Sequence, residues 1–196
     1  MNKITNNISI EHLEYIKSKY GHVASFAIWK DKDIKEKSNM DIILFDDKLD
    51  KLNVNIILVG LNISKKIDRP FGNFHPNYST AHDYKIRYAL KDTIFEGAYM
   101  TDIIKDFEEK VSGRLINYLS NNPDFLQENL LSFSNELKDI GSVNPIIIAF
   151  GNDCYNILNS NLKDKFTIYK VSHYSACISK ETLRIEFEDI IKKYVN

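Results

Sequence analysis

Two loops of the sequence carry side chains that could act on a bound ligand. The first contains Asn62, which follows the apolar run 54–60 and Leu61. The second spans residues 171–179 and surrounds His173 with small polar residues. A carboxamide can orient a water molecule or hold a polar ligand edge, and a histidine can donate a hydrogen bond to developing negative charge. These residue types suit a site that recognises a polar ligand, an oxyanion or a phosphate.

The same loops also have ordinary structural explanations. Asn62 or Ser64 could cap a following helix by accepting a hydrogen bond from a backbone N–H group. Ser179 could cap the last helix in the same way. These explanations leave the site hypothesis open, because Ser179 can cap a helix while His173 acts on a ligand.

Two further segments carry side chains that are expected to pack or form hydrogen bonds. One is an irregular loop rich in aromatic residues, and the other is an apolar run that contains two polar residues. Residues 68–78 contain two prolines, a glycine and three aromatic side chains, which disfavours a regular helix or strand. Such a loop is costly unless it packs against the fold or binds something. Thr101 and Asp102 lie inside another apolar run, where unpaired polar groups are costly, so we expect them to form hydrogen bonds near the site.

The elements that position these loops follow from the pattern of apolar residues. Four apolar runs predict buried strands, and helical spacing separates them. The expected strands span 54–60, 98–104, 145–151 and 166–171, and the expected helices span 8–20, 80–91, 124–140, 153–158 and 180–194. This alternation predicts a mostly parallel sheet with helices on both faces. Ligands bind beyond the carboxyl ends of such strands, where the loops that begin at Gly60, Asp102, Gly151 and Ser172 should meet.

Local signals support several of these boundaries. Gly21 and Gly141 are expected helix stops, and Asn122-Pro123-Asp124 is typical of a helix start. Residues 22–29 are ambiguous between a strand and a buried helix, and residues 40–45 form a short apolar run.

Composition excludes several classes of protein. The 196 residues are 43% hydrophobic with a net charge of -1, which excludes a disordered chain and gives no overall polybasic signature. Two cysteines are too few for a disulfide scaffold or a four-cysteine metal site. His75, His82 and Asp83 match no standard zinc spacing, and neither G-x-x-x-x-G-K nor G-x-G-x-x-G occurs. We therefore expect no metal and no cofactor.

The chain begins without a basic and then apolar signal, and it has no apolar run of membrane-spanning length. We expect a single reduced domain in the cytoplasm, with no membrane partner. The pattern leaves the oligomeric state open.

The order of the loops resembles that of the uracil-DNA glycosylase superfamily, nearest its mismatch-specific and thymine-DNA glycosylase branch. Gly60-Leu61-Asn62 is similar to the strand-ending G-[IL]-N-P motif of that branch, and residues 71–77 are similar to its F-x-H-P-x-N run. Residues 97–104 resemble a strand that reads G-x-x-x-T-D, and residues 148–151 resemble the next strand and its glycine turn. Residues 173–176 resemble the final H-P-S-P loop. The matches occur in order between residues 55 and 179.

The resemblance implies a three-layer α/β/α sandwich around a short, mostly parallel sheet of four strands. Residues 54–179 would form the core, residues 1–50 an N-terminal elaboration and residues 180–196 a C-terminal helix. The implied activity is hydrolysis of the N-glycosidic bond of a damaged, mismatched or modified base that has been flipped into an aromatic pocket. The implied partner is DNA or another nucleic acid.

The resemblance also assigns roles to individual residues. Asn62 would orient or activate the attacking water, and His173 would stabilise negative charge on the departing base or contact the neighbouring phosphate. Phe71 or Phe74 would stack on the base, and Asn73 would read its polar edge. The expected substrate contacts are Gly60, Leu61, Phe71, Asn73, Phe74, His75, Thr101, Asp102, Gly151 and Asn152. The expected phosphate contacts are Ser64, Lys65, Ser172, Ser175 and Lys180.

The chain departs from the family pattern at three points. Ile63 and Tyr174 each replace a proline, and the first motif lacks the general-base aspartate of the uracil-specific branch. Asn62 is not a Brønsted base near neutral pH. Two alternatives therefore stand beside a glycosylase: a non-catalytic module that binds a nucleobase or nucleic acid, and a hydrolase of a small nucleoside-like substrate. The small-molecule enzyme would have a closed pocket without a basic rim.

Overall fold

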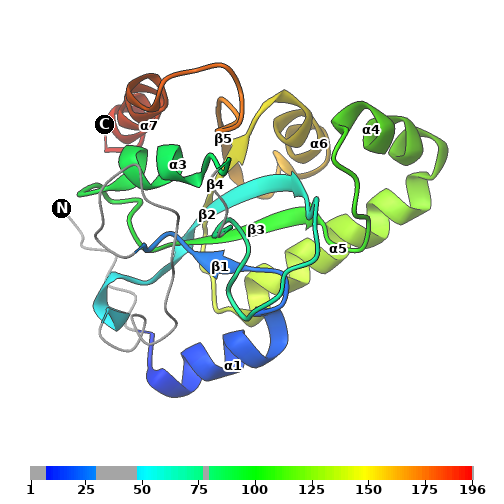
Figure 1. The fold of residues 1–196 in the computed structure, drawn as a ribbon. Helices are drawn as coiled ribbons and strands as arrows, with labels where there is room; N and C mark the ends of the chain where they lie inside the picture. Colours follow the sequence, from blue (N-terminus) through cyan, green and yellow to red (C-terminus); the bar gives the residue numbers. More distant parts are fainter. Residues whose placement is uncertain (1–7, 30–47, 77–79, 196) are drawn as a thin grey trace.

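The computed structural model describes residues 8–29, 48–76 and 80–195, and the apolar run 40–45 lies outside the described residues. The chain folds around one sheet with the strand order β1-β3-β2-β4-β5 (Figure 1). The strands are β1 (Ser25–Phe26), β2 (Asn53–Asn62), β3 (Ala98–Ile104), β4 (Ile146–Phe150) and β5 (Thr167–Val171). Strands β3, β2, β4 and β5 are parallel, as the alternation of strands and helices predicts.

The sheet has five strands, so the prediction of four is wrong. The additional strand, β1, consists of only two residues and pairs antiparallel with the edge of β3. It lies in the segment 22–29, whose apolar pattern does not distinguish a strand from a buried helix. Two residues are too few to show the alternation that identifies a strand.

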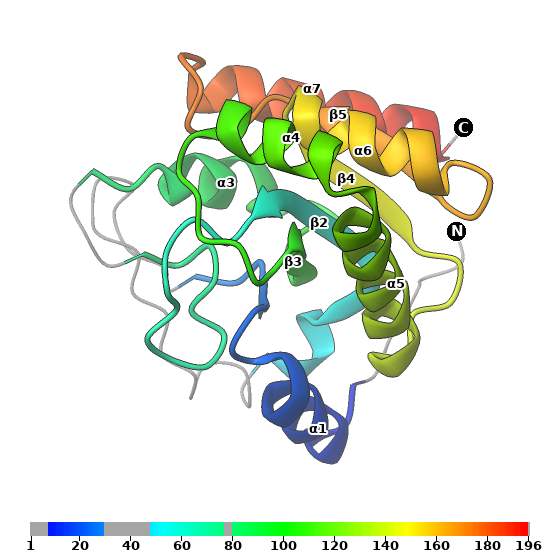
Figure 2. The ribbon, with the colours of Figure 1, turned by 90° about the vertical axis from the view of Figure 1, so that its right-hand side faces the viewer.

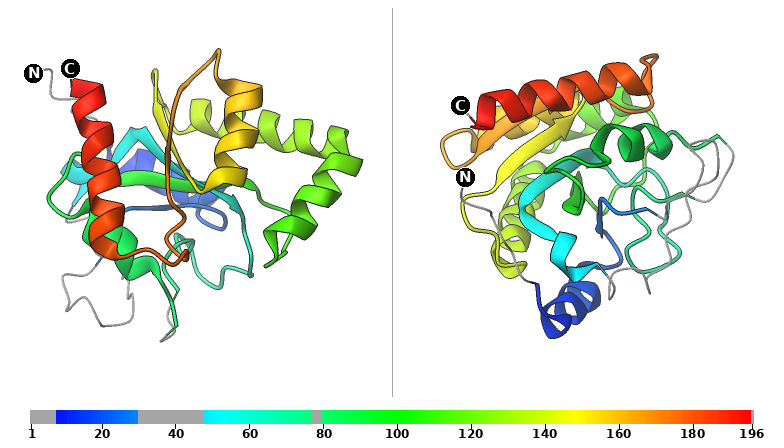
Figure 3. Two further views of the ribbon diagram at one scale, coloured as in Figure 1. Left: turned by 90° about the horizontal axis from the view of Figure 1, so that it is seen from above. Right: turned by 90° about the vertical axis from the view of Figure 1, so that its left-hand side faces the viewer.

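Helices cover both faces of the sheet and give it three layers (Figures 2 and 3). One face packs against α1 (Ile10–Tyr20), α4 (Ser112–Asn121), α5 (Pro123–Asp139) and α6 (Asn152–Leu162). The other face packs against α3 (Asp83–Leu90) and α7 (Lys180–Val195). A short 3-10 helix, η1 (Leu49–Lys51), precedes β2. Both faces of the central strands are thus buried, which explains why they read as continuous apolar runs.

Most of the predicted boundaries are confirmed, but α4 was not predicted. Gly141 follows α5 with a φ of 76°, and Ser179 Oγ accepts a hydrogen bond from Thr182 N at the start of α7. The apolar residues Leu115, Ile116 and Leu119 of α4 follow helical spacing, so the sequence carried a signal for this helix that the prediction did not use. The alternative of a helix cap at Asn62 does not hold, because β2 continues to Asn62 and the next described helix begins at Asp83.

The order of the strands creates a crevice at one edge of the sheet. The chain passes from β2 to β3 on one side, and it then crosses to β4 on the other side of β2. Where the connections of neighbouring strands run in opposite directions, the loops at the carboxyl ends of these strands separate. In parallel sheets, ligands commonly bind in the crevice between these loops. The loops after Asn62, Phe150 and Val171 begin at this edge.

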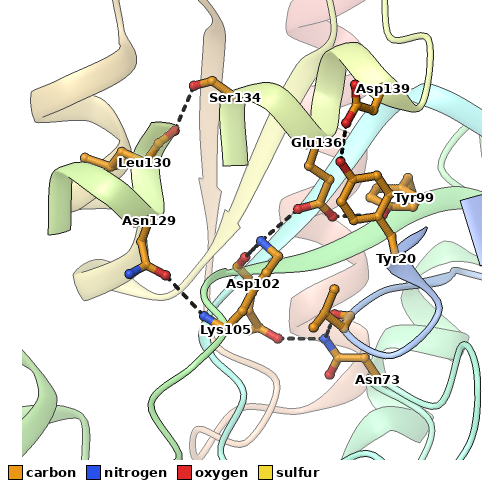
Figure 4. A network of polar contacts seen from close by, with 11 residues as sticks. Tyr20, Asn73, Tyr99, Asp102, Lys105, Asn129, Leu130, Ser134, Glu136 and Asp139 are labelled. Atoms are coloured by element: carbon orange, nitrogen blue, oxygen red, sulfur yellow. Dashed lines mark hydrogen bonds and ion pairs between the residues drawn. The ribbon is translucent and has the colours of Figure 1, made fainter. Parts of the chain in front are cut away.

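A buried ion pair holds the end of β3 to α5 (Figure 4). Lys105 Nζ lies 2.8 Å from Glu136 Oε2, and the side chain of Glu136 is completely buried. Tyr99 donates a hydrogen bond of 2.8 Å to the other carboxylate oxygen. Lys105 Nζ also donates to the carbonyl of Asp102 at 2.6 Å. The pair therefore fixes the backbone just where the strand meets the crevice.

None of the helices among the described residues is both long enough and apolar enough to cross a membrane.

We predict that Lys105→Met lowers the free energy of unfolding by about 3 to 5 kcal/mol, because it leaves the Glu136 carboxylate buried without its counterion. Urea unfolding measures this change. Lys192→Met, which breaks an exposed pair with Asp189, is the control and should leave stability unchanged. Equal stability of the two variants would show that the buried pair does not hold β3 to α5.

Candidate functional site

A cavity of about 570 Å³ lies at the carboxyl ends of β2, β3 and β4. Its volume falls within the range of small-molecule sites. Ten of the residues predicted from the sequence line it. They are Gly60, Leu61, Asn62, Ser64, Phe74, Asp102, Gly151, Asn152, His173 and Ser175. The structure therefore brings the two candidate catalytic side chains, Asn62 and His173, to one site.

The other predicted residues do not line this cavity. They are Lys65, Phe71, Asn73, His75, Thr101, Ser172 and Lys180. The hydroxyl and N–H of Ser172 both bind the carboxylate of Glu186, at 2.7 and 2.6 Å. The hydroxyl of Thr101 is buried in the sheet without a hydrogen-bond partner among the described residues, contrary to the expectation from the sequence. Lys180 Nζ lies over the ring of Tyr88, 4.5 Å from its centroid.

Phe71 and His75 belong to the core rather than to the cavity. Phe71 is completely buried, and its ring lies 5.6 Å from that of Phe26. His75 Nε2 lies 3.0 Å from the Phe26 carbonyl and must donate to it, because a carbonyl only accepts. Burial lowers the pKa of His75 to about 3, so this histidine is neutral. Both side chains anchor the aromatic loop, and Phe74 is the member that reaches the cavity.

Asn62 shapes the cavity through its amide nitrogen. Nδ2 donates hydrogen bonds to the carbonyls of Phe107 and Glu109, at 3.0 and 2.8 Å. This ties the loop between β3 and α4 to the end of β2. Oδ1 accepts no hydrogen bond from the described residues and is therefore available to a water molecule or a ligand.

The hydrogen bonds of His173 determine which ring nitrogen carries the proton. Nδ1 accepts from the Ser175 N–H at 3.2 Å and lies 2.7 Å from the Ser175 hydroxyl. The neutral ring therefore carries its proton on Nε2, where it can serve as a donor. Burial and the nearby His82 lower the pKa of His173, which favours this neutral form.

The position of His173 depends on two neighbours. Its ring stacks on Tyr174, with the centroids 4.4 Å apart. Gly151 packs against it with a φ of 84°, and a Cβ at Gly151 would lie 3.3 Å from His173 Cβ. A glycine meets both the backbone conformation and the close approach.

Asp102 is the buried carboxyl group at the end of β3. Its Oδ2 accepts a hydrogen bond of 2.7 Å from Asn73 Nδ2 (Figure 4). Burial raises the pKa of Asp102 to about 6, and the Asn73 hydrogen bond and Lys105 oppose this rise. A group with this pKa changes its charge close to neutral pH. Asn73 does not line the cavity itself, but its hydrogen bond orients the Asp102 carboxyl group and lowers the pKa of that group.

Three aromatic rings form an apolar part of the cavity wall. The ring centroids of Phe74, Phe150 and Tyr174 lie between 5.4 and 6.2 Å from one another. Phe150 was not among the predicted site residues, although its place at the end of an expected strand is a signal that could have found it. Lys85 Nζ donates to the carbonyl of Ala176 at 3.0 Å and ties α3 to the loop of His173.

A second groove of about 540 Å³ adjoins the cavity and shares Ser64, Glu109 and Lys110 with it. Its walls carry four basic and two acidic side chains. The basic ones are Lys65, Lys66, Lys110 and Arg114, and the acidic ones are Glu108 and Glu109. The rim of the cavity is therefore basic on this side.

The fold and the site together define an α/β protein with a polar and aromatic cavity at the carboxyl edge of a mostly parallel sheet. Comparisons with known protein families, with curated proteins and with solved structures found no match for the chain. Among the described residues, no group of three or more histidine, cysteine, aspartate or glutamate side chains is placed to hold a metal ion.

We predict that the neutral His173 ring carries its proton on Nε2, because Nδ1 accepts from Ser175. Long-range ¹H–¹⁵N NMR spectra of the imidazole distinguish the two tautomers. The exposed His22 is the control and should show the mixture of tautomers typical of a ring in water. A protonated Nδ1 in His173 would contradict the assignment.

We predict that Asn62→Asp opens the loop between β3 and α4. The change removes two hydrogen bonds, each worth about 1 kcal/mol, so the opening equilibrium should rise about tenfold or more. Limited digestion with trypsin at Lys110 measures it. Asn117→Asp, on the exposed side of α4, should leave the cleavage rate unchanged, and equal rates for both variants would refute the role of Asn62.

Proposed function

We propose that the protein hydrolyses the N-glycosidic bond of a nucleobase held in the cavity. The observation that carries this proposal is the convergence of Asn62, His173 and the aromatic wall on one space. A base has two flat faces and a polar edge, so an aromatic wall can hold its faces while polar groups read its edge.

The two candidate catalytic side chains suit the two halves of the reaction. Breaking the bond leaves negative charge on the base, which the N–H of a neutral His173 can stabilise. It also leaves positive charge on the sugar, which an oriented water molecule can attack. The Oδ1 of Asn62, which accepts no hydrogen bond from the described residues, can accept one from that water.

The basic groove favours a nucleic acid over a free nucleoside as the substrate. A nucleoside carries no phosphate and needs no basic rim. The groove meets the cavity at Ser64 and Lys110, so a strand whose base occupies the cavity could place its phosphates beside Lys66 and Arg114. Such contacts make binding weaker as the salt concentration rises.

A second candidate function is a binding module that lacks catalysis. The presence of Ile63 and Tyr174 where the resembled family has prolines favours it, because these loops surround the proposed reaction centre. Binding without turnover would distinguish this module from an enzyme.

The experiment that tests the proposed function is single-turnover base excision. The protein is incubated with labelled single- and double-stranded oligonucleotides that contain uracil, mismatched uracil or thymine, hypoxanthine or alkylated bases, and alkali then reveals abasic sites. We expect excision of at least one base, and we expect Asn62→Ala and His173→Ala to slow it about 100-fold or more.

Asn117→Ala and His22→Ala are the matched controls, because both residues are exposed and lie outside the cavity. Both should excise at the rate of the unaltered protein. Binding at low salt without excision of any base would refute the catalytic proposal and leave the binding module.

A further inference from the structure

Neither of the two candidate catalytic side chains can take a proton from a water molecule in the cavity. The amide of Asn62 is not basic at neutral pH, and its nitrogen is already bound to two carbonyls. The Nδ1 lone pair of His173 is used by Ser175, and Nε2 carries the proton. Attack by water gains from a group that removes its proton, so this group must come from elsewhere.

The register of the sheet places a carboxyl group beside Asn62. Gly60 of β2 pairs with Asp102 of the parallel strand β3. A Cβ at Gly60 would overlap Asp102 Oδ1 and lie 3.1 Å from Phe74 Cζ, so the carboxyl group fills the space that glycine leaves. Asn62 is two residues further along β2, and alternate residues of a strand face the same side. The carboxyl group and the Asn62 amide therefore border the same part of the cavity.

The hydrogen bonds of Asp102 fix one oxygen and leave the other available. Oδ2 accepts from Asn73 Nδ2. Asn73 is itself held by the carbonyl of Val23 at 2.8 Å and by the N–H of Phe74 at 3.0 Å. Oδ1 accepts no hydrogen bond from the described residues. The carboxyl group is thus oriented by one oxygen, while the other can meet a water molecule in the cavity.

We propose that Asp102 is the general base of this cavity and acts on a water molecule that Asn62 orients. This inference rests on the proposed function. Asp102 Oδ1 takes a proton from the water, whose oxygen forms a bond to the anomeric carbon of the sugar. The carbon–nitrogen bond breaks, and its electron pair goes to the base, where the His173 N–H stabilises it. The proton on Asp102 then passes to the released base or to solvent, which completes the hydrolysis.

The groups around Asp102 set its pKa in a range that suits a general base. Lys105 at the end of β3 and Glu136 of α5 act on it in opposite directions, and the thiol of Cys154 in α6 also lies within electrostatic reach. Burial exceeds both charge effects and raises the pKa to about 6. The carboxyl group is therefore ionised at neutral pH, but it binds a proton more readily than an exposed aspartate does.

The test uses the excision assay with whichever base the unaltered protein removes. Asp102→Asn, which keeps the shape of the side chain, should lower kcat about 100-fold or more. Asp106→Asn, an exposed carboxylate outside the cavity, should leave kcat unchanged. Thermal unfolding of each variant shows whether it is folded.

The pH profile of kcat separates a base from a residue that only supports the fold. The unaltered protein should lose activity as the pH falls through about 6, where Asp102 becomes protonated. Asn73→Ala should shift this decline to a higher pH, because the hydrogen bond from Asn73 stabilises the ionised form, and its activity should recover at alkaline pH. A purely structural effect would lower kcat without moving the decline.

The outcomes distinguish this inference from the proposed function. Excision by the unaltered protein together with undiminished excision by folded Asp102→Asn overturns the role of Asp102 alone. If Asp83→Asn loses activity and Asp102→Asn does not, the general base is a different carboxylate of the cavity. That result also overturns the role proposed for Asp102. An unaltered protein that excises no base overturns both the proposed function and this inference.

Discussion

The pairing of β2 with β3 is the constraint on which the rest of the structure depends. Both strands are buried on both faces, and their register sets Gly60 beside Asp102. A shift of one residue would turn the carboxyl group to the opposite face of the sheet. Given this register, position 60 has no room for a side chain, and the aromatic loop must fold back so that Asn73 can reach the carboxyl group. One pairing of strands thus determines the floor of the cavity and the path of a distant loop.

This arrangement lowers the stability of the protein at neutral pH. Raising the pKa of a buried aspartate from 3.8 to about 6 corresponds to about 3 kcal/mol of folding free energy. The folded state binds the Asp102 proton more tightly than the unfolded state, so the contribution of this group to stability is greatest at low pH and falls as the pH rises through this range. An asparagine could accept the hydrogen bond from Asn73 without this loss. A buried carboxyl group with a raised pKa is a feature that groups performing chemistry commonly share.

The sequence was sufficient to predict the parallel core, because strands buried on both faces read as apolar runs. The predicted strand 98–104 matches β3 residue for residue. It was not sufficient for β1, whose two residues show no period. Helix α4 was missed although Leu115, Ile116 and Leu119 follow helical spacing. The loops of the site were predicted from the sequence because each directly follows the carboxyl end of a predicted strand. Phe71 and Phe74 could not be separated, because the path of the loop decides which ring faces the cavity, and that path depends on contacts with Gly21 and Phe26.

The same reasoning bears on the choice between an enzyme and a binding module. A module that only recognises a base needs the aromatic wall, the polar edge contacts and the basic groove. It gains nothing from a carboxyl group that is buried, oriented by one oxygen and open to the cavity at the other. Asn62 belongs to both descriptions, because it faces the cavity and also holds the loop whose residues Glu109 and Lys110 border the groove. Asp102 holds the aromatic loop through Asn73, but its second oxygen makes no such contact with the described residues, and that is the feature of its setting that favours catalysis over binding alone.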